Sequence, residues 1–174
     1  MAAPGLSAAP TVAELLALDL LTLREHTEQA GDRLDPEAHA GQLSESLRSS
    51  RLCWVRRDAE VIAYAMLKRV SAASWFVAAF NIHPKHRSAP VIGELMAQVA
   101  TLLADEGALD LTSHVYKTNR RSLAFHARLG FRVAEENDKA VAFFATLQDV
   151  AAAPGLKRLL LRRSGVSKAH LHGR

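Results

Sequence analysis

Residues 75–116 constrain the fold most, because two apolar stretches flank one amphipathic stretch. Residues 75–82 are almost continuously apolar, which predicts a central strand covered on both faces. From Pro90 to Gly107, apolar residues recur every three or four positions, as on one face of a helix. Residues 109–116 again have a strand pattern. A strand, a helix and a strand in this order form a right-handed crossover with the two strands parallel.

Two helices and two further strands are expected before this crossover. Thr11 and Glu14 have the spacing of a capping box, so a helix begins there and should continue to Gly31. Asp35 and Pro36 supply the N-cap and first-turn proline of a second helix. Short polar turns separate three strands of an antiparallel meander, at residues 52–55, 61–67 and 75–82.

A shorter helix and a hairpin are expected after the crossover. Thr118 or Asn119 caps the helix, and Gly130 ends it. The hairpin joins residues 131–136 to residues 140–147. With 174 residues and 49% apolar composition, the chain can bury one core. We therefore predict an α/β fold with a mixed, mostly antiparallel twisted sheet and helices on both faces, in a single domain at residues 1–149.

Residues 150–174 form a predicted basic C-terminal extension. Leu159–Leu161, flanked by basic residues, could form a short amphipathic helix, but Gly165 and the polar end favour a frayed segment. Residues 150–174 contain no acidic residue, and without their six basic residues the chain has 16 Lys and Arg against 18 Asp and Glu. The domain alone is thus formally −2, although the whole chain is +4. A general polyanion partner is therefore not indicated, and nucleic acid is an unlikely partner. The six basic residues are Lys157, Arg158, Arg162, Arg163, Lys168 and Arg174.

Several sequence features favour a cytoplasmic protein. Cys53 is the only cysteine and lies in an apolar run, so an intramolecular disulfide is excluded. Residues 1–10 lack the charged and apolar regions of a secretory signal. Residues 12–23 are the longest apolar stretch, but Glu14 and Asp19 interrupt it, so no transmembrane segment is expected.

The loop between the predicted central strand and its helix carries the first functional motif, within residues 80–95. Lys85, His86, Arg87 and Ser88 stand just before the helix start. Helix N-termini offer unpaired N–H groups and a positive dipole end, which suit a phosphate group. The alternative is that these basic residues only decorate an exposed turn.

A second motif follows the next strand and decides between these interpretations. It contains Asn119, Ser122, His126 and the pair Gly130-Phe131. Taken together with the first loop, it resembles the GNAT N-acetyltransferase superfamily, over residues 52–147. Members of that family hold the coenzyme A pyrophosphate in the first loop. The loop here departs from the family pattern, because Pro90 and Ile92 replace glycines and remove one backbone donor.

The resemblance implies an acetyl-CoA-dependent N-acetyltransferase. The acceptor would be a primary amine of a small molecule or peptide, which attacks the thioester directly. The domain's negative formal charge favours a cationic amine. The residues expected to bind the coenzyme A co-substrate are Ile82, Arg87, Ser88, Ala89, Val91, Ile92, Asn119 and Phe125. Ile82 would contribute its backbone N–H to the thioester carbonyl.

The catalytic residues expected from the resemblance are histidines. His126 occupies the position of the family's usual tyrosine acid, and an imidazole can donate a proton at neutral pH. In some relatives this histidine only lines the pocket. No carboxylate occurs in residues 75–82, so the general base would be His83, His114, Tyr116 or relayed water.

Two other classes of function remain open from the sequence. The lost glycines and absent strand carboxylate suggest a degenerate, non-catalytic acyl-CoA-binding or interaction module. The basic extension suggests docking on nucleic acid or an anionic membrane surface. No metal site is expected, since His170 and His172 form only a lone pair. A homodimer is possible, and the family's usual opening strand is not evident in residues 1–10.

Overall fold

A computed structural model of the protein describes residues 8–164 and contains every helix and strand predicted before residue 147. The expected first helix is divided in two at Leu23. The elements are α1 (Val12–Thr22), α2 (Arg24–Gln29), α3 (Pro36–Ser49), β1 (Ser50–Arg57), β2 (Glu60–Arg69), β3 (Ser74–Ile82), the 3₁₀ turn η1 (Pro84–His86), α4 (Ala89–Asp105), β4 (Asp110–Tyr116), α5 (Arg120–Arg128), β5 (Arg132–Glu136), β6 (Ala140–Thr146), α6 (Leu147–Ala152) and α7 (Pro154–Ser164).

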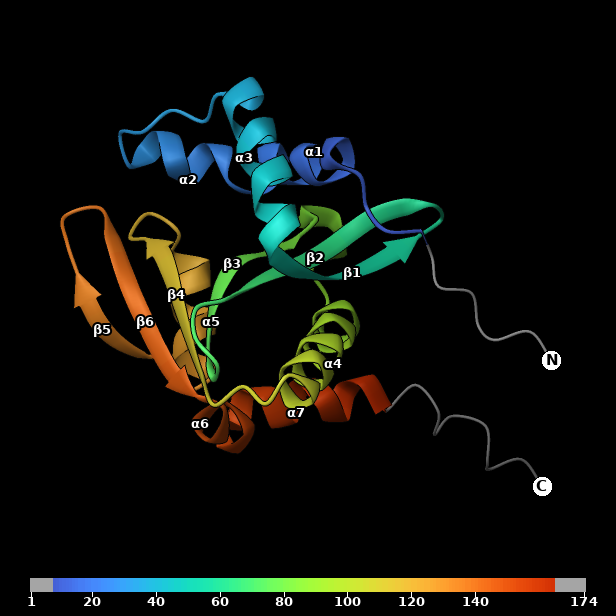
Figure 1. The fold of residues 1–174 in the computed structure, drawn as a ribbon, viewed down its shortest axis with the longest axis vertical. Helices are drawn as coiled ribbons and strands as arrows, with labels where there is room; N and C mark the ends of the chain where they lie inside the picture. The colour runs from blue at the N-terminus through green and yellow to red at the C-terminus, as the bar shows by residue number, and fades with distance from the viewer. Residues whose placement is uncertain (1–7, 165–174) are drawn as a thin grey trace.

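One six-stranded sheet in the order β1-β2-β3-β4-β6-β5 organises the molecule. All neighbouring strands are antiparallel except β3 and β4, which are parallel because α4 connects them. Helices α1 to α3 lie on one side of the sheet, and α4 to α7 lie on the other (Figure 1). The predicted mixed, mostly antiparallel sheet with helices on both faces is thus confirmed.

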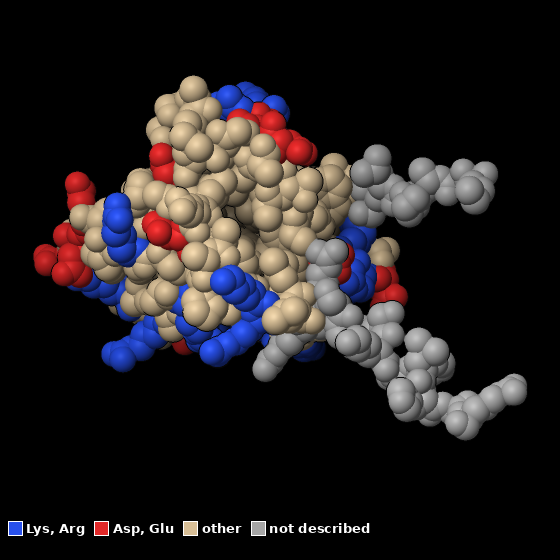
Figure 2. All heavy atoms as spheres, turned by 90° about the horizontal axis from the view of Figure 1, so that it is seen from below, with Lys and Arg blue, Asp and Glu red and all other residues tan. Residues whose placement is uncertain are grey.

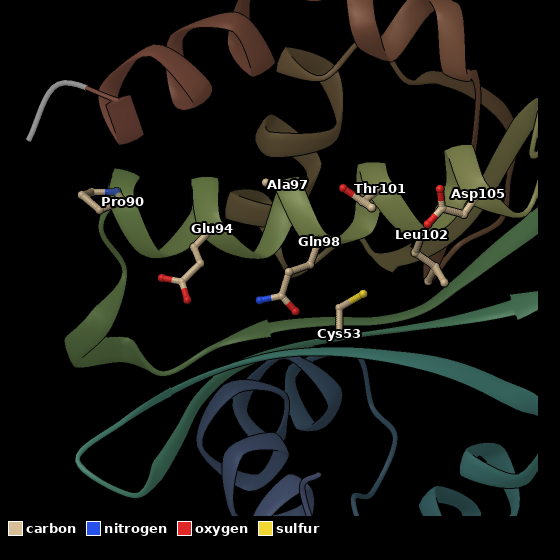
Figure 3. A pocket seen from close by; sticks show the side chains of 8 residues that line it. All are labelled: Cys53, Pro90, Glu94, Ala97, Gln98, Thr101, Leu102 and Asp105. Atoms are coloured by element: carbon tan, nitrogen blue, oxygen red, sulfur yellow. The ribbon is translucent and has the colours of Figure 1, made fainter. Parts of the chain in front are cut away.

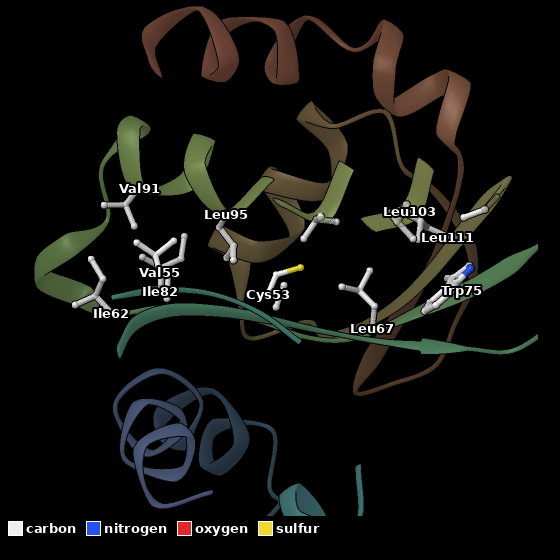
Figure 4. Close-up of a cluster of buried hydrophobic side chains, with 14 residues drawn as sticks. Cys53, Val55, Ile62, Leu67, Trp75, Ile82, Val91, Leu95, Leu103 and Leu111 are labelled. Carbon is white, nitrogen blue, oxygen red and sulfur yellow. The ribbon is translucent and has the colours of Figure 1, made fainter. Parts of the chain in front are cut away.

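The main core fills the space between α4 and the strands β1 to β4 (Figure 4). A second core, between α1, α3 and the opposite face of the sheet, is centred on Leu15, Leu43 and Tyr64. As a result, residues 61–67 of β2 are all buried. The prediction of full cover on both faces was wrong for β3, since Ala78 is exposed and its neighbours are only half-buried. The reason is that β3 separates from β4 in this region.

The helix caps predicted from the sequence are present. Thr11 Oγ1 accepts the Glu14 N–H at 3.3 Å, while the Glu14 carboxylate accepts the Thr11 N–H at 2.8 Å. Asp35 Oδ1 accepts the Ala38 N–H at 2.9 Å at the start of α3. These bonds satisfy first-turn donors that have no acceptor inside the helix.

Residues 147–164 fold back on the domain as α6 and α7, so the expected frayed segment was wrong for this part of the chain. Val150 and Leu156 are buried beside Met96 of α4 and Leu129, the C-cap of α5. A Cβ atom on Gly155 would clash with the Arg128 carbonyl oxygen, so α7 approaches α5 closely. Residue 149, where the predicted domain ends, therefore lies inside α6, and residues 165–174 lie outside the described part of the chain.

Strand β1 forms one edge of the sheet, because no opening strand precedes α1 in the described residues. The Gln98 side chain of α4 reaches this edge. It accepts the Trp54 N–H at 3.2 Å and donates to the Trp54 carbonyl at 2.9 Å. The Gln98 amide thus satisfies the backbone N–H and carbonyl of Trp54, which a neighbouring strand would otherwise pair with. Across residues 8–164, no helix has the length and apolar character needed to cross a membrane.

Candidate active site

A gap between β3 and β4 is the central feature of the site. The two strands pair only at residues 74–77 and 110–113, although β3 continues to Ile82 and β4 to Tyr116. The register between β2 and β3 shifts at Met66/Leu67, which leaves Ala78 as the extra residue of a bulge. Bulges bend a strand and often occur beside active sites. Here the bulge coincides with the point where β3 leaves β4.

The backbone of β3 presents hydrogen-bonding groups to this gap. The His83 N–H donates to the Ile62 carbonyl at 2.7 Å, so this position faces β2. Alternate residues of an antiparallel ladder face opposite edges. Phe80 and Ile82 therefore face the gap, and Arg87 Nε donates to the Ile82 carbonyl at 3.3 Å from that side. The Ile82 N–H therefore faces the gap, and its contact with a thioester stays a prediction, while the Phe80 N–H is an additional donor that sequence patterns did not single out.

Two arginines lie close to each other at the open end of the gap. Arg87 precedes α4, and Arg121 lies in the first turn of α5. Partial burial and then the positive charge of Arg121 lower the pKa of Arg87. In the described part of the chain, neither guanidinium has a carboxylate within 4.0 Å. Two like charges without a counter-charge make a site that would favour an anion.

The N-terminus of α4 adds backbone donors beside Arg87. Ser88 is the N-cap, but its side chain makes no capping hydrogen bond, so first-turn N–H groups at Ala89 and Val91 have no side-chain acceptor from it. Pro90 has no N–H group. Ile92 donates its N–H to the Ser88 carbonyl at 3.0 Å and packs against the core. Of the expected loop residues, Ile92 is thus the least suited to bind a phosphate.

Asn119 and Phe125 place α5 beside the gap. The Asn119 side chain accepts the Ser122 N–H at 3.0 Å and so caps the helix. The Phe125 ring lies 5.5 Å from the Phe80 ring, between centroids. This contact joins α5 to β3 beyond the point where β3 and β4 separate. Both residues lie near the gap, and their contact with coenzyme A stays a prediction.

His126 is buried on the α5 side of β4, at the point where the gap begins. Its Nδ1 lies 2.8 Å from the Ser122 carbonyl, and its Nε2 lies 3.0 Å from Ser113 Oγ. A carbonyl can only accept, so Nδ1 carries the proton and Nε2 accepts from the Ser113 hydroxyl. The ring also stacks on Phe143 at 4.8 Å between centroids. Desolvation lowers the pKa of His126, which favours this neutral form.

Two other candidates, His114 and Tyr116, lie on the opposite face of the sheet, toward α1 to α3. Successive strand residues point to opposite faces, so His114 and the buried Ser113 face different sides. His114 is exposed and contacts the Phe76 ring edge-on, with 5.2 Å between centroids. The Tyr116 hydroxyl donates to Asp32 Oδ2 at 2.9 Å, and burial chiefly raises the pKa of Tyr116.

His83 is held by the loop and is separated from the other two histidines. Its Nδ1 accepts the Lys85 N–H at 3.2 Å, and its Nε2 lies 3.9 Å from Glu60 Oε1. The structure therefore does not bring His83, His114 and His126 together. It places one candidate on each face of the sheet and the third at the end of β3. Ser113, which bonds His126, gave no recognisable signal in the sequence.

A groove of the described residues lies elsewhere, between α4 and β1 (Figure 3). It has a volume of 840 Å³ and is lined by residues that include Cys53, Glu94, Gln98 and Asp105. Burial raises the pKa of the Cys53 thiol to about 11, so the thiolate is disfavoured. Within the same part of the chain, no group of three or more His, Cys, Asp or Glu side chains could hold a metal ion.

Basic side chains are prominent on the side of the sheet that carries α4 and α7. Figure 2 shows Lys and Arg around the margin of this face, while its centre is uncharged and hollowed. Acidic side chains gather at one end of the same view. The charge is therefore unevenly distributed over this face.

Comparison with protein families decides the relationship suggested by this geometry. The model of the acetyltransferase (GNAT) family matches residues 15–131. The chain belongs to the GNAT acetyltransferase family. The match covers the gap, the loop before α4 and all of α5. Curated protein sequences gave no match.

Solved structures of GNAT acetyltransferases share the fold. PaiA N-acetyltransferase from Thermoplasma acidophilum, in complex with coenzyme A, has 13% identity and a TM-score of 0.63, over 78% of this chain and 92% of that one. The ribosomal-protein-S18-alanine N-acetyltransferase from Escherichia coli has 14% identity and a TM-score of 0.60, over 80% and 91%. A GNAT enzyme from Elizabethkingia anophelis with acetyl-CoA bound has 13% identity and a TM-score of 0.59, over 83% and 95%.

Proposed function

We propose that the protein transfers the acetyl group of acetyl-CoA to a primary amine of a small molecule or peptide by direct attack. The observation that carries this proposal is the gap between β3 and β4, with Arg87 and Arg121 at its open end. Family membership supports acetyl transfer, and coenzyme A or acetyl-CoA is bound in two of the similar structures.

The proposed binding mode follows from the groups at the gap. The pyrophosphate would lie between Arg87, Arg121 and the first turn of α4, where two positive charges and a helix N-terminus coincide. The pantetheine arm would lie between the separated strands. The N–H groups of Phe80 and Ile82 would then be available to polarise the thioester carbonyl.

Two proton transfers complete the proposed reaction, since the amine loses a proton and the coenzyme A thiolate gains one. We assign the base to His114, because it is the exposed histidine on the side away from α5. His126 remains the proposed acid, although it must first take up a proton on Nε2 in place of its bond from Ser113. Because burial lowers the pKa of His126, an acid role predicts faster turnover as the pH falls toward that pKa.

Coenzyme A binding can be tested separately from turnover. Calorimetry with acetyl-CoA should show about a tenfold or greater loss of affinity for Arg87→Ala and for Arg121→Ala, since each removes a charge-assisted contact to phosphate. Arg48→Ala is the matched control, because Arg48 is an exposed arginine of α3 paired with Glu45. Equal affinities for all three variants would contradict the proposed phosphate site.

Turnover decides between the enzyme and the non-catalytic acyl-CoA-binding module that the lost glycines suggest. Thiol release should be followed with acetyl-CoA and a panel of primary amines, with cationic amines included because the domain is formally acidic. An enzyme should release thiol in an amine-dependent manner, and His114→Ala should slow it at saturating acetyl-CoA. Tight acetyl-CoA binding without turnover on any amine would instead support the binding module.

A further inference from the structure

A buried carboxylate joins α1, α3 and the strands β2 and β3 on the side of the sheet away from α5. Asp19 of α1 is 1% exposed and accepts three hydrogen bonds. Its Oδ1 accepts from the Tyr64 hydroxyl and from Asn81 Nδ2, each at 2.6 Å, while its Oδ2 lies 2.7 Å from His39 Nε2. Four elements far apart in the sequence thus meet at one side chain.

The charge of this carboxylate is balanced by a group that can lose its proton. Within the described residues, Asp19 has no Lys or Arg partner, and His39 is its only ion-pair partner. A buried charge without compensation is costly, so the state with His39 protonated is the electrically neutral pair. The His39 side chain is 17% exposed, so solvent reaches the imidazole.

One arm of this network ends at the proposed site. Asn81 is the residue of β3 immediately before Ile82, whose N–H faces the gap. The Asn81 side chain points to Asp19 and also lies 3.3 Å from the Tyr64 hydroxyl. Because β3 does not pair with β4 here, this end of the strand is held by its pairing with β2, and the bond from Asn81 to Asp19 adds a tie to α1.

We propose that Asp19 is a positioning residue for acyl transfer, which holds the end of β3 through Asn81 and depends on protonated His39 for its counter-charge. This inference rests on the proposed function, because positioning matters only if the Phe80 and Ile82 N–H groups bind the thioester. The effect on β3 itself needs no ligand: the end of β3 should be better ordered when His39 is protonated than when His39 is neutral.

The direction of the pH effect follows from the groups that face His39. The charged group that acts on the His39 imidazole is Asp19 of α1, and Gln42 on the same helix as His39 is neutral. Tyr64 and Asn81 bond to Asp19 and influence His39 only through it. The hydrogen bond to Asp19 raises the pKa of His39 above its usual value. The stabilisation of the folded state by protonated His39 is therefore complete below the ordinary histidine pKa, and it is lost as the pH rises through the raised pKa of His39.

Amide hydrogen exchange tests the structural part without any ligand. The probe is the His83 N–H, which donates to the Ile62 carbonyl at the end of β3. Asn81→Ala should speed its exchange about tenfold or more, because the bond to a buried carboxylate is lost. Gln98→Ala is the matched control, since it also removes an amide that ties a helix to the sheet, but at β1. Equal exchange in both variants would overturn the inference.

A second variant keeps the test decisive if Asn81→Ala does not fold. Asp19→Asn has the same size, can still accept from Tyr64 and Asn81, and can donate to neutral His39. Exchange at His83 in the wild type should quicken as the pH rises through the pKa of His39, after correction for intrinsic exchange. In Asp19→Asn that pH dependence should vanish. The same dependence in both proteins would refute the role of His39.

Turnover of acetyl-CoA with an accepted amine tests the functional part. Asn81→Ala should lower kcat about tenfold with little change in the KM for acetyl-CoA, whereas Gln98→Ala should change neither by more than about twofold. If kcat is unchanged in Asn81→Ala although exchange is faster, Asp19 is not a positioning residue. If the wild type shows no turnover at all, the proposed function fails, while the exchange experiment still decides the pH-dependent order of β3.

Discussion

Removing the buried part of Leu156 should destabilise the whole domain, although this residue lies in the segment expected from sequence to be a frayed extension. Leu156 is 7% exposed and packs with Met96, Leu129 and Val150. Leu→Ala changes in cores cost about 2–5 kcal/mol, and the lower half of this range applies because a helix at the margin of the core can partly close the cavity. We expect a loss of about 2–3 kcal/mol.

Urea unfolding followed by circular dichroism measures this loss directly. For a chain of this size, about 2–3 kcal/mol corresponds to a fall in Tm of roughly 4–12 °C. Leu161→Ala is the matched control, because Leu161 belongs to the same helix but is 71% exposed, and its change should stay within about 0.5 kcal/mol. If both variants unfold at the same urea concentration as the wild type, α7 does not contribute to the cooperative unit.

Three further predictions concern separate parts of the molecule. Gly155→Ala should lower the free energy of unfolding by at least about 1 kcal/mol, because the added methyl meets the Arg128 carbonyl, and an unchanged urea midpoint would argue against this close approach. Because burial lowers the pKa of His126, the free energy of unfolding should decrease as the pH falls below the ordinary histidine pKa. The urea midpoint should therefore fall between about pH 7 and pH 5 in the wild type and should depend less on pH in His126→Phe. An equal pH dependence of the midpoint in both proteins would refute this. Asp32→Ala should remove the acceptor of both Tyr116 and Lys139, so the spectroscopically titrated pKa of Tyr116, which burial chiefly raises, should fall part of the way toward its usual value; an unchanged titration would contradict the contact.

Local sequence rules located most elements because their signals are short-range. Thr11 with Glu14, and Asp35 with Pro36, predicted the helix starts that the structure contains. The crossover rule predicted the parallel pairing of β3 with β4. The burial of Leu156 was not predicted by local rules, because the apolar face of α7 is covered by residues of α4 and the end of α5, which are distant in the sequence.

The candidate site was predictable only where its groups belong to a motif. Arg87 and Asn119 were found through the loop and cap patterns around them. Arg121, Ser113 and Asp19 were missed, because their roles depend on partners that are distant in the sequence. Ser113 meets His126 across 13 positions, and Asp19 meets Asn81 across 62. Periodicity and spacing rules do not predict contacts between residues this far apart in the sequence, because these contacts form only when the sheet assembles.

The Gln98 side chain on the edge of β1 has a consequence for how the protein behaves at high concentration. An uncovered strand edge is a template for pairing with another molecule, and the Gln98 amide occupies both outward groups of Trp54 in the middle of that edge. Loss of this amide would leave the core intact, because Gln98 contributes no buried apolar surface to it. The Gln98 amide therefore protects the β1 edge more than it stabilises the fold, and Gln98→Ala should favour pairing of this edge with other molecules at high protein concentration.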